Sequence, residues 1–491
     1  MPDFRDHSAV VIEDFNGLWH RGDDDSVPAD HFSSCNNVKF SQSSFSWRSG
    51  LTPYLPFANI VRVYTFVKPI GQSLICLDTD GNFWDTDYPD NPILTVANAT
   101  DFAFSGYSTR CYISPSDVNA GLLNDFLYVY LGDGTPARKA AGAKPTDTDG
   151  ALAAANSGSA GNVEAGIHVF AVVYETDTGF LTAIGPDTLP TVTAPGGEAV
   201  NLTNIPTSPN SYVTKVHVIA TKAINPDFYT GNTTGYQFFF VPGAVVNNAT
   251  TTLSVSFFDN ELLEDASYLL DMFEEIPAFL GLTTYHGRLV GWAEGENPTV
   301  MRISVAGEPE AINQVDGLVV FPSNVYFNNA CEYRDVLYGF GVTQTVGWAD
   351  NGDVPSSWKP QPVDQGLGAH PHTVATVLDS NGVTAEFVLI ANLSGLYLFN
   401  GAYQNPELSW KIRDTWLALD LFNFYKNQLV NDSINQCLYF VLNDGTVLYA
   451  DYSNGLNHKD IRWTPWTFDV FVTSMCIHDQ KQLTIASNGL A

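Results

Sequence analysis

Short runs of apolar and aromatic residues, closed by glycine-containing turns, recur along most of the chain. Residues 74–85 read LICLDTDGNFWD, where an apolar run leads through Asp80-Gly81 into an aromatic run. This pattern is typical of a β-hairpin that buries one face and turns at a positive φ angle. Helical periodicity is rare, so the pattern predicts an all-β protein. Similar units occur at 126–137 (Asp133-Gly134), 387–401 (Ser394-Gly395) and 437–450 (Asp444-Gly445), more loosely at 283–305 and 332–348, and at the final strand with Asn488-Gly489.

The spacing of these units predicts their arrangement. Outside one long insertion they recur roughly every 35 to 60 residues, which is the self-similarity expected of the blades of a β-propeller. Radial repetition hides strand edges, and it suits a chain that has few helices to cover its sheets. We therefore predict a β-propeller of about six or seven blades. An array of β-sandwiches is the alternative architecture.

An insertion divides the predicted propeller. Residues 139–165 are rich in Ala, Gly, Ser and Thr, and are predicted to form a small-residue linker. Residues 166–259 contain about seven short strand-like runs, which suits an inserted immunoglobulin-like β-sandwich. Residues 260–275 (NELLEDASYLLDMFEE) are predicted to return as a helix. The remaining divisions are 1–138, holding the N-terminal segment and first blades, and 260–491, holding the other blades. The apolar face of this helix is predicted to hold Leu262, Leu263, Leu269, Leu270 and Phe273.

The net charge of the chain limits the kinds of partner that it can bind. The 491 residues include 22 Lys and Arg against 53 Asp and Glu, which gives a net charge of −31. Binding to nucleic acid by phosphate neutralisation needs a concentrated basic surface, so this mode is excluded. Anionic membrane surfaces are disfavoured for the same reason. The acidic opening does not resemble a signal peptide, and no run approaches the ~20 apolar residues of a membrane span. We expect a protein made in a cytoplasm, with no membrane insertion.

The cysteines do not indicate a metal site. They lie far apart with no CxxC spacing, so a zinc ribbon is not expected. Most stand in apolar strings, where a free buried thiol is the expected state, although the even count leaves disulfides open. The six positions are Cys35, Cys76, Cys111, Cys331, Cys437 and Cys476.

Several short patterns suggest binding chemistry but have simpler interpretations. Three Asp-x-Asp pairs resemble the start of a calcium loop, yet none continues into the full ligand series, so turn stabilisation is expected. His370-Pro371-His372 could offer two metal ligands, but the proline interrupts the strand and no third ligand is near. Arg21-Gly22-Asp23 spells an integrin-type tripeptide within an acidic loop and is expected to be a chance match. The acidic pairs are Asp78/Asp80, Asp85/Asp87 and Asp147/Asp149.

Four tryptophans leave a carbohydrate-binding function open. Trp463 and Trp466, with Trp410 and Trp416 nearby, could stack on sugar rings. A glycosidase would also need a placed carboxylate pair, and no spacing in the chain nominates one. The alternative is that these residues close the connection between neighbouring blades. GxSxG, P-loop and HExxH motifs are absent from the sequence, so we predict no catalytic, cofactor-binding or metal-binding residues.

Several motifs, taken in order, resemble the tail nozzle proteins of short-tailed bacteriophages. The segment LYVYLGDGTPARK resembles their second blade, and VYETDTGFLTAIGP with VTKVHVIATKA resembles their inserted sandwich. SGLYLFNG and RWTPWTF continue the pattern to the last blades. The matching positions are Gly17-Leu18, Pro28, Asn37-Val38, Arg48-Ser49-Gly50, His286-Gly287-Arg288-Leu289, Ser304 and Pro309-Glu310.

This resemblance implies a virion structural protein that is not an enzyme and has no cofactor. Such nozzles form a homo-hexameric ring below the portal and its adaptor, contact tail fibre or tailspike proteins, and pass genomic DNA through a lumen without specific binding. The charge fits, because acidic walls repel phosphates whereas basic walls would hold them. Two alternatives stay open: a carbohydrate-binding propeller, as a receptor-binding tail protein or glycan-active enzyme, and a minor tail or head-closure protein of a long-tailed phage.

Overall fold

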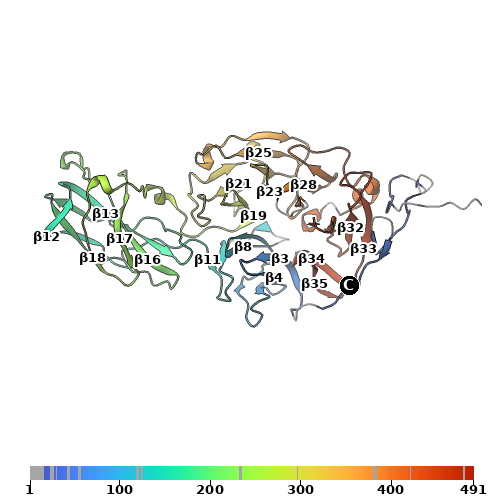
Figure 1. Ribbon diagram of the computed structural model, residues 1–491, viewed down its shortest axis with the longest axis horizontal. Helices are drawn as coiled ribbons and strands as arrows, with labels where there is room; N and C mark the ends of the chain where they lie inside the picture. Colours follow the sequence, from blue (N-terminus) through green and yellow to red (C-terminus); the bar gives the residue numbers. More distant parts are fainter. Residues whose placement is uncertain are drawn as a thin grey trace, which may run out of the picture.

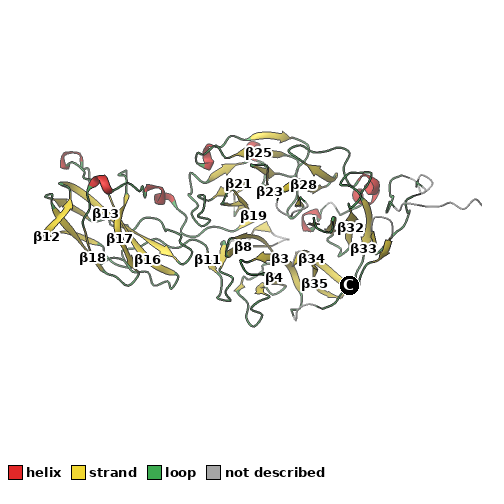
Figure 2. Ribbon diagram, in the orientation of Figure 1, coloured by secondary structure: helices red, strands yellow, loops and turns green. Residues whose placement is uncertain are grey.

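The protein is built almost entirely from antiparallel β-sheets, as predicted (Figure 2). In the residues that the structure describes, the single α-helix is α1 (Arg413–Leu417). None of the described helices has the length and apolar character needed to cross a bilayer. The computed structural model describes residues 16–22, 27–28, 30–40, 45–53, 57–117, 121–122, 125–231, 235–295, 297–379, 384–420, 422–478 and 482–490.

Seven successive sheets form the larger body, on the right in Figure 1, and a β-sandwich forms the smaller body on the left. Two of the seven sheets precede the sandwich in the chain. The first contains β3 (Ile60–Val67), β4 (Gln72–Asp78), β5 (Asn82–Asp85) and β6 (Leu94–Thr95), and the second contains β7 (Asp101–Tyr107), β8 (Arg110–Asp117), β9 (Gly121–Leu122), β10 (Tyr128–Tyr130) and β11 (Arg138–Lys139).

Five sheets follow the sandwich. The third sheet holds β19 (Phe279–Tyr285), β20 (Arg288–Glu294), β21 (Asn297–Ile303) and β22 (Leu318–Val320), and the fourth sheet holds β23 (Asn329–Tyr333), β24 (Val336–Phe340), β25 (Thr345–Ala349) and β26 (Gln361–Asp364). The fifth sheet holds β27 (Val374–Leu378), β28 (Ala385–Asn392) and β29 (Gly395–Phe399). The sixth sheet holds β30 (Gln428–Asp432), β31 (Cys437–Val441), β32 (Val447–Asp451) and β33 (Arg462–Trp466), and the seventh holds β34 (Val470–His478) and β35 (Gln482–Leu490).

The first strands of these sheets follow one another around a common centre. In chain order β3, β7, β19, β23, β27, β30 and β34 each contact the next, and β34 contacts β3. Side chains tie this last contact: Ser474 Oγ accepts from the Val63 amide at 3.3 Å, and Thr65 Oγ1 donates to the Ile477 carbonyl at 2.7 Å. The arrangement is propeller-like, with the seven sheets standing in the place of blades.

The predicted hairpin turns lie where glycine is required. Gly81, between β4 and β5, has φ +82°, and a Cβ there would lie 2.2 Å from the Val96 carbonyl oxygen. Gly134 and Gly445 also have positive φ angles in their turns. The expected unit at Asn488-Gly489 differs, because both residues lie within β35 rather than in a turn.

The inserted sandwich is larger at its start than predicted. Two sheets with the orders β12-β15-β18 and β14-β13-β16-β17 enclose their own apolar core. β12 falls inside the expected 139–165 linker, which is a correction: its exposed small residues form an edge strand paired with β15. The seven strands are β12 (Ala153–Val163), β13 (Gly166–Thr176), β14 (Thr191–Ala194), β15 (Glu198–Thr203), β16 (Val213–Ala220), β17 (Phe239–Asn247) and β18 (Thr252–Val255).

The helix predicted over 260–275 is wrong. The segment contains two short 3-10 turns, η3 (Asp259–Glu261) and η4 (Ser267–Asp271), separated by residues 262–266. Leu262 and Leu269 are buried, but Leu263 and Leu270 are exposed, so the leucines do not share one face. Backbone bonds instead fix the segment along β17: the Phe240 amide donates to the Glu264 carbonyl, and the Ala266 amide to the Phe238 carbonyl.

The N-terminal strap, which we define as residues 16–22 and 30–40, lies on the sixth sheet rather than beside the first. The Leu18 amide donates to the Trp463 carbonyl, and the Asn37 amide to the Pro465 carbonyl, both at 2.9 Å. Its strand β1 (Val38–Phe40) pairs with β2 (Phe45–Trp47). The Gly17-Leu18 and Asn37-Val38 motifs therefore attach the beginning of the chain to β33.

One apolar cluster joins the two bodies. Val169 and Val173 of β13, on the face away from the sandwich core, pack in the same buried cluster as Leu127 and Ile276 of the larger body. Because burial of apolar surface is the main source of stability, this shared core holds the sandwich against the second and third sheets.

Candidate functional site

The six cysteines are all buried free thiols. This confirms the expectation from their apolar surroundings and leaves no disulfide among them. Burial raises the pKa of Cys331 to about 12, so this thiol stays protonated and unreactive near neutral pH.

The acidic pairs serve turns and buried ion pairs. Asp78 accepts from the amides of Asp80 and Asn82 at 2.9 Å, as expected of a turn-stabilising aspartate. Asp149 likewise accepts from the Thr146 amide at 3.0 Å. Asp85 is fully buried and pairs with Lys68 Nζ at 3.1 Å. In each pair at least one carboxylate is therefore committed to a contact within the fold.

The histidines of His370-Pro371-His372 do not converge on one point. Nε2 of His372 lies 2.8 Å from Asp101 Oδ2, and its Nδ1 lies 2.9 Å from the Tyr64 hydroxyl. Both ring nitrogens of His372 are thus engaged. The His370 ring packs against Phe424, and burial lowers the pKa of His370 to about 4. Both side chains therefore take part in contacts within the fold.

Asp101 also anchors a buried arginine. Arg62 Nε donates to Asp101 Oδ1 at 2.6 Å, and both side chains are about 5% exposed. Burial works against ionisation of Asp101, but the charges of Arg62 and His372 outweigh it and hold the pKa of Asp101 well below its ordinary value. Arg62, Asp101 and His372 join the first, second and fifth sheets near the centre of the ring.

The tryptophans do not form a stacking platform. Trp416, Trp463 and Trp466 are buried, and the Nε1 of Trp466 donates to the Val38 carbonyl at 2.8 Å. Trp410 packs edge-on against Trp19 of the N-terminal strap and lies under Arg21. These contacts place Trp416, Trp463 and Trp466 in the interior of the fold and Trp410 against the strap. Of the tripeptide at 21–23, Arg21 and Gly22 belong to the strap, and Asp23 lies outside the described residues.

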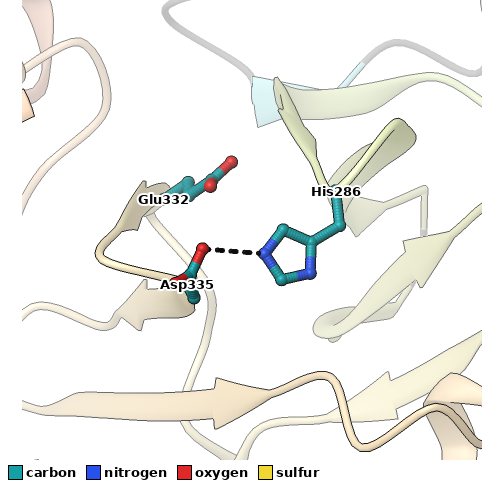
Figure 3. Close-up of side chains that lie close together, drawn as sticks. All are labelled: His286, Glu332 and Asp335. Carbon is teal, nitrogen blue, oxygen red and sulfur yellow. Dashed lines mark hydrogen bonds and ion pairs between the residues drawn. The ribbon is translucent and has the colours of Figure 1, made fainter. Parts of the chain in front are cut away.

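One group of side chains places three possible metal-ligand atoms together, and sequence reasoning missed it. His286 stands on the β19–β20 turn, Asp335 on the β23–β24 turn and Glu332 on β23, with their ligand atoms within 4.8 Å of one another (Figure 3). His286 Nε2 is 3.3 Å from Asp335 Oδ1. Burial and the nearby Asp335 charge raise the pKa of Glu332. Both turns were visible in the sequence, but their neighbouring positions follow from the order of the sheets.

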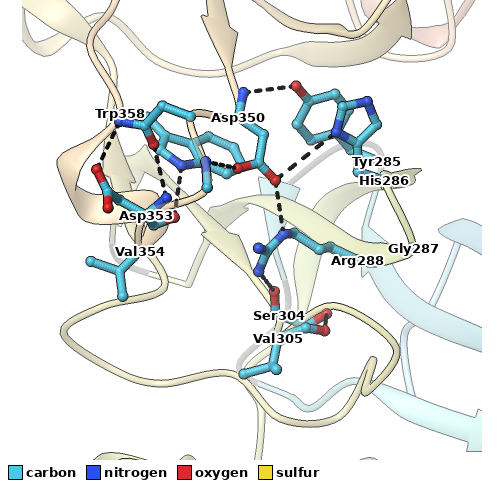
Figure 4. Close-up of polar contacts among 12 residues, drawn as sticks. Tyr285, His286, Gly287, Arg288, Ser304, Val305, Asp350, Asp353, Val354 and Trp358 are labelled. Atoms are coloured by element: carbon cyan, nitrogen blue, oxygen red, sulfur yellow. Dashed lines mark hydrogen bonds and ion pairs between the residues drawn. The ribbon is translucent and has the colours of Figure 1, made fainter.

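Polar contacts continue from His286 to Tyr285, Asp350 and Arg288 (Figure 4). The Tyr285 hydroxyl donates to the Asp335 carbonyl at 2.9 Å and accepts from the Asp350 amide at 3.0 Å. Asp350 Oδ2 lies 3.4 Å from Arg288 Nε and 4.0 Å from His286 Nδ1. His286 and Asp335 could ligate a cation, yet each already contacts a protein partner, and Asp335 is largely exposed.

The Pro309-Glu310 motif lies at the junction between the two bodies. Glu310 is 1% exposed, and its Oε2 accepts from the Ala141 amide at 2.8 Å. Arg138 lies between Glu310 and Asp177 of the sandwich, with contacts of 3.3 and 2.5 Å. Arg110 Nη1 donates to the Thr178 carbonyl at 2.7 Å. These residues fix where the sandwich leaves the larger body. Arg138, Asp177 and Glu310 belong to motifs quoted from the sequence, but their mutual contact was not predicted.

A cavity of about 260 Å³ lies at the centre of the ring of sheets. Its walls come from the first strands of six sheets and the loops beside them, and they mix polar and apolar groups. The lining includes Tyr64, Leu282, Asn329, Cys331, His372 and Gln428.

Comparison with known proteins adds no family. No protein-family model and no curated protein matches the chain. Among solved structures, U3-55K is similar at 7% sequence identity over 88% of each chain, with a TM-score of 0.35. PorZ of Porphyromonas gingivalis is similar at 10% identity over 59% of this chain and 34% of its own, with a TM-score of 0.25. Raptor of Chaetomium thermophilum is similar at 11% identity over 72% and 29%, with a TM-score of 0.27.

Proposed function

We propose that this chain is a structural, non-catalytic subunit of a bacteriophage tail, a nozzle that assembles into a ring through which DNA leaves the virion. The observation that carries the proposal is the charge. A net charge of −31 leaves a large excess of acidic groups. Among the described residues, ten lysines and arginines already pair with acidic side chains of the protein.

The pairing of these cations bears directly on DNA. Lys68 and Arg62, for example, are about nine-tenths buried or more, so their charges face carboxylates rather than solvent. A surface that neither concentrates cations nor presents them in a row cannot displace the counterions of duplex DNA. A wall of this kind repels phosphates and lets the duplex pass without being held.

A DNA conduit requires more than one copy of the chain. The central cavity of about 260 Å³ is far too small for duplex DNA, whose major groove alone is ~12 Å wide. A passage for DNA would therefore run between subunits arranged in a ring. Cyclic homo-oligomers with head-to-tail interfaces form such rings when the rotation between neighbours closes. We place the chain in the virion tail, between the head-tail adaptor and the fibre or tailspike proteins.

Mass photometry of the purified full chain, over a range of concentrations, tests this proposal. We expect a species of about six times 53.6 kDa, the mass of one chain. The same preparation should leave duplex DNA unretarded in a gel at 50 to 200 mM salt, a range over which phosphate-binding proteins lose affinity steeply. Specific binding to a glycan array by a monomeric protein would instead favour a receptor-binding role.

A further inference from the structure

Turns of two neighbouring sheets bring three metal-ligand groups to one place. His286 lies on the β19–β20 turn, Glu332 lies within β23, and Asp335 lies on the β23–β24 turn. One ligand atom from each side chain lies within 4.8 Å of the other two. Figure 3 shows Glu332 and Asp335 extending from the fourth sheet toward the imidazole ring of the third. One imidazole and two carboxylates form a mixed set of nitrogen and oxygen donors, which differs from a purely acidic surface.

The separation of two of these ligand atoms fits a shared metal ion. His286 Nε2 lies 3.3 Å from Asp335 Oδ1. A charge-assisted hydrogen bond between a ring nitrogen and a carboxylate is shorter, about 2.7–2.9 Å. Two ligands that bind one zinc ion tetrahedrally, each at ~2.0–2.2 Å, stand roughly 3.3–3.6 Å apart. The contact between these two side chains is therefore compatible with both of them binding the same ion.

The charges of the group also call for a cation. Two ionised carboxylates at this separation repel each other. In the part of the chain that the structure describes, neither carboxylate forms an ion pair with a lysine or arginine. Arg288 instead contacts Asp350 and the Ser304 carbonyl, and the Arg334 guanidinium lies 5.0 Å from the centre of the Tyr333 ring. With a neutral imidazole the three groups carry a charge of about −2, which a divalent cation would neutralise.

The imidazole ring is oriented from its other side. It stacks on the Tyr285 ring, with 4.2 Å between the ring centres and 16° between the planes. Asp350 Oδ2 lies 4.0 Å from Nδ1, the nitrogen that does not face Asp335 (Figure 4). The Asp350 amide donates to the Tyr285 hydroxyl at 3.0 Å, so one tyrosine contacts both the ring and the aspartate behind it. Histidines that bind metals commonly have a carboxylate at the second ring nitrogen, which fixes the tautomer and the ring orientation.

We propose that His286, Glu332 and Asp335 bind one divalent transition-metal ion of the zinc class, which joins the turns of the third and fourth sheets. Three protein ligands leave the fourth position of a tetrahedral zinc ion to water. The imidazole favours zinc over magnesium and calcium, because those two ions take oxygen ligands. This proposal departs from the sequence-based prediction of no metal-binding residues, and it does not rest on the proposed function.

Calorimetric titration of the metal-free full chain with Zn²⁺ tests the proposal. We expect one ion bound per chain. Loss of a carboxylate behind a ligating histidine typically weakens metal binding ~10–100-fold, and we expect this range for D350N. H286A and E332Q remove a ligand itself and should each weaken binding at least as much, by ~100-fold or more. H20Q, which changes an exposed histidine outside the group, is the control and should bind Zn²⁺ as the native chain does.

A spectroscopic measurement locates the ion. Co²⁺ in place of Zn²⁺ should give visible absorption bands in the native chain and in H20Q, and these bands should be lost in E332Q. E332Q keeps the size and shape of the side chain, and far-UV circular dichroism checks that the variant is folded.

Three results would overturn the proposal: no bound Zn²⁺ in the native chain, equally tight binding in H286A and E332Q, or release of the ion by an equimolar amount of Ca²⁺. The second result would show adventitious binding elsewhere on the chain. Binding per chain is measured whatever the oligomeric state, so the outcome is separate from that of the ring.

Discussion

Arg138 and Glu310 are 172 positions apart in the chain, yet Arg138 Nη1 lies 3.3 Å from Glu310 Oε2. The same guanidinium reaches Asp177 at the edge of the sandwich. One arginine therefore satisfies a buried carboxylate of the larger body and a half-buried carboxylate of the smaller body. Together with the shared apolar cluster around Val169 and Leu127, this contact fixes the position of the sandwich on the larger body.

Removing that arginine should destabilise the junction. In R138M the Glu310 carboxylate stays buried without its cation, and breaking a buried pair in this way costs about 3–5 kcal/mol. Urea unfolding should show this loss, and small-angle X-ray scattering should show a broader distribution of distances between the two bodies. The control K144M breaks a pair with the largely exposed Asp187, which is worth about 0–1 kcal/mol. Equal effects of the two variants would contradict the assigned role of Arg138.

His370 should make the protein sensitive to mild acid. Its pKa is lowered by burial to about 4 in the folded state, against an ordinary value of 6.5. Between these values the unfolded chain binds more protons than the folded one, so stability is highest above pH 6.5 and falls as the pH drops towards 4. The expected loss is at most ~3 kcal/mol, and H370Q should reduce it. Unfolding by urea at pH 7 and pH 5 measures the difference, with the exposed His20 replaced in H20Q as the control. An unchanged pH dependence in H370Q would rule out this residue as the cause.

The N-terminal strap should depend on one glycine. Gly17 has φ +80°, and a Cβ there would lie 2.8 Å from the backbone nitrogen of Trp463. Gly179 also has a positive φ, +81°, but a Cβ there would have no other atom within 4 Å. The variant G179A is therefore destabilised only by its backbone conformation and not by a clash. We expect G17A to cost at least ~1 kcal/mol more than G179A and to expose the strap to proteolysis. Similar protease resistance of both variants would show that the strap is not attached through this close approach.

Local features were predictable from the sequence because their causes are local. A glycine at positive φ between two apolar runs marks a turn whatever the rest of the chain does, and Gly81, Gly134 and Gly445 lie in such turns. Burial of the cysteines follows in the same way from their apolar neighbours. The all-β class was predictable because it follows from many such local signals along the chain.

Features that depend on distant partners were missed. β12 has the composition of a linker, and only its pairing with β15 makes it a strand. The leucines of 260–275 suggested a helix, but backbone bonds from Glu264 and Ala266 to Phe240 and Phe238 hold the segment against β17 instead. The approach of His286 to Asp335 and the junction around Arg138 arise from the order of the sheets, which no spacing in the sequence reveals.

Cryo-electron microscopy of the purified assembled chain is the decisive test of the proposed DNA conduit, because it shows both the assembly and the charge of its inner wall. We expect a sixfold ring with an open lumen wide enough for duplex DNA and lined by acidic and uncharged side chains. A lumen lined by lysine and arginine would rule the conduit out, as would a protein that remains monomeric at the highest concentration reached.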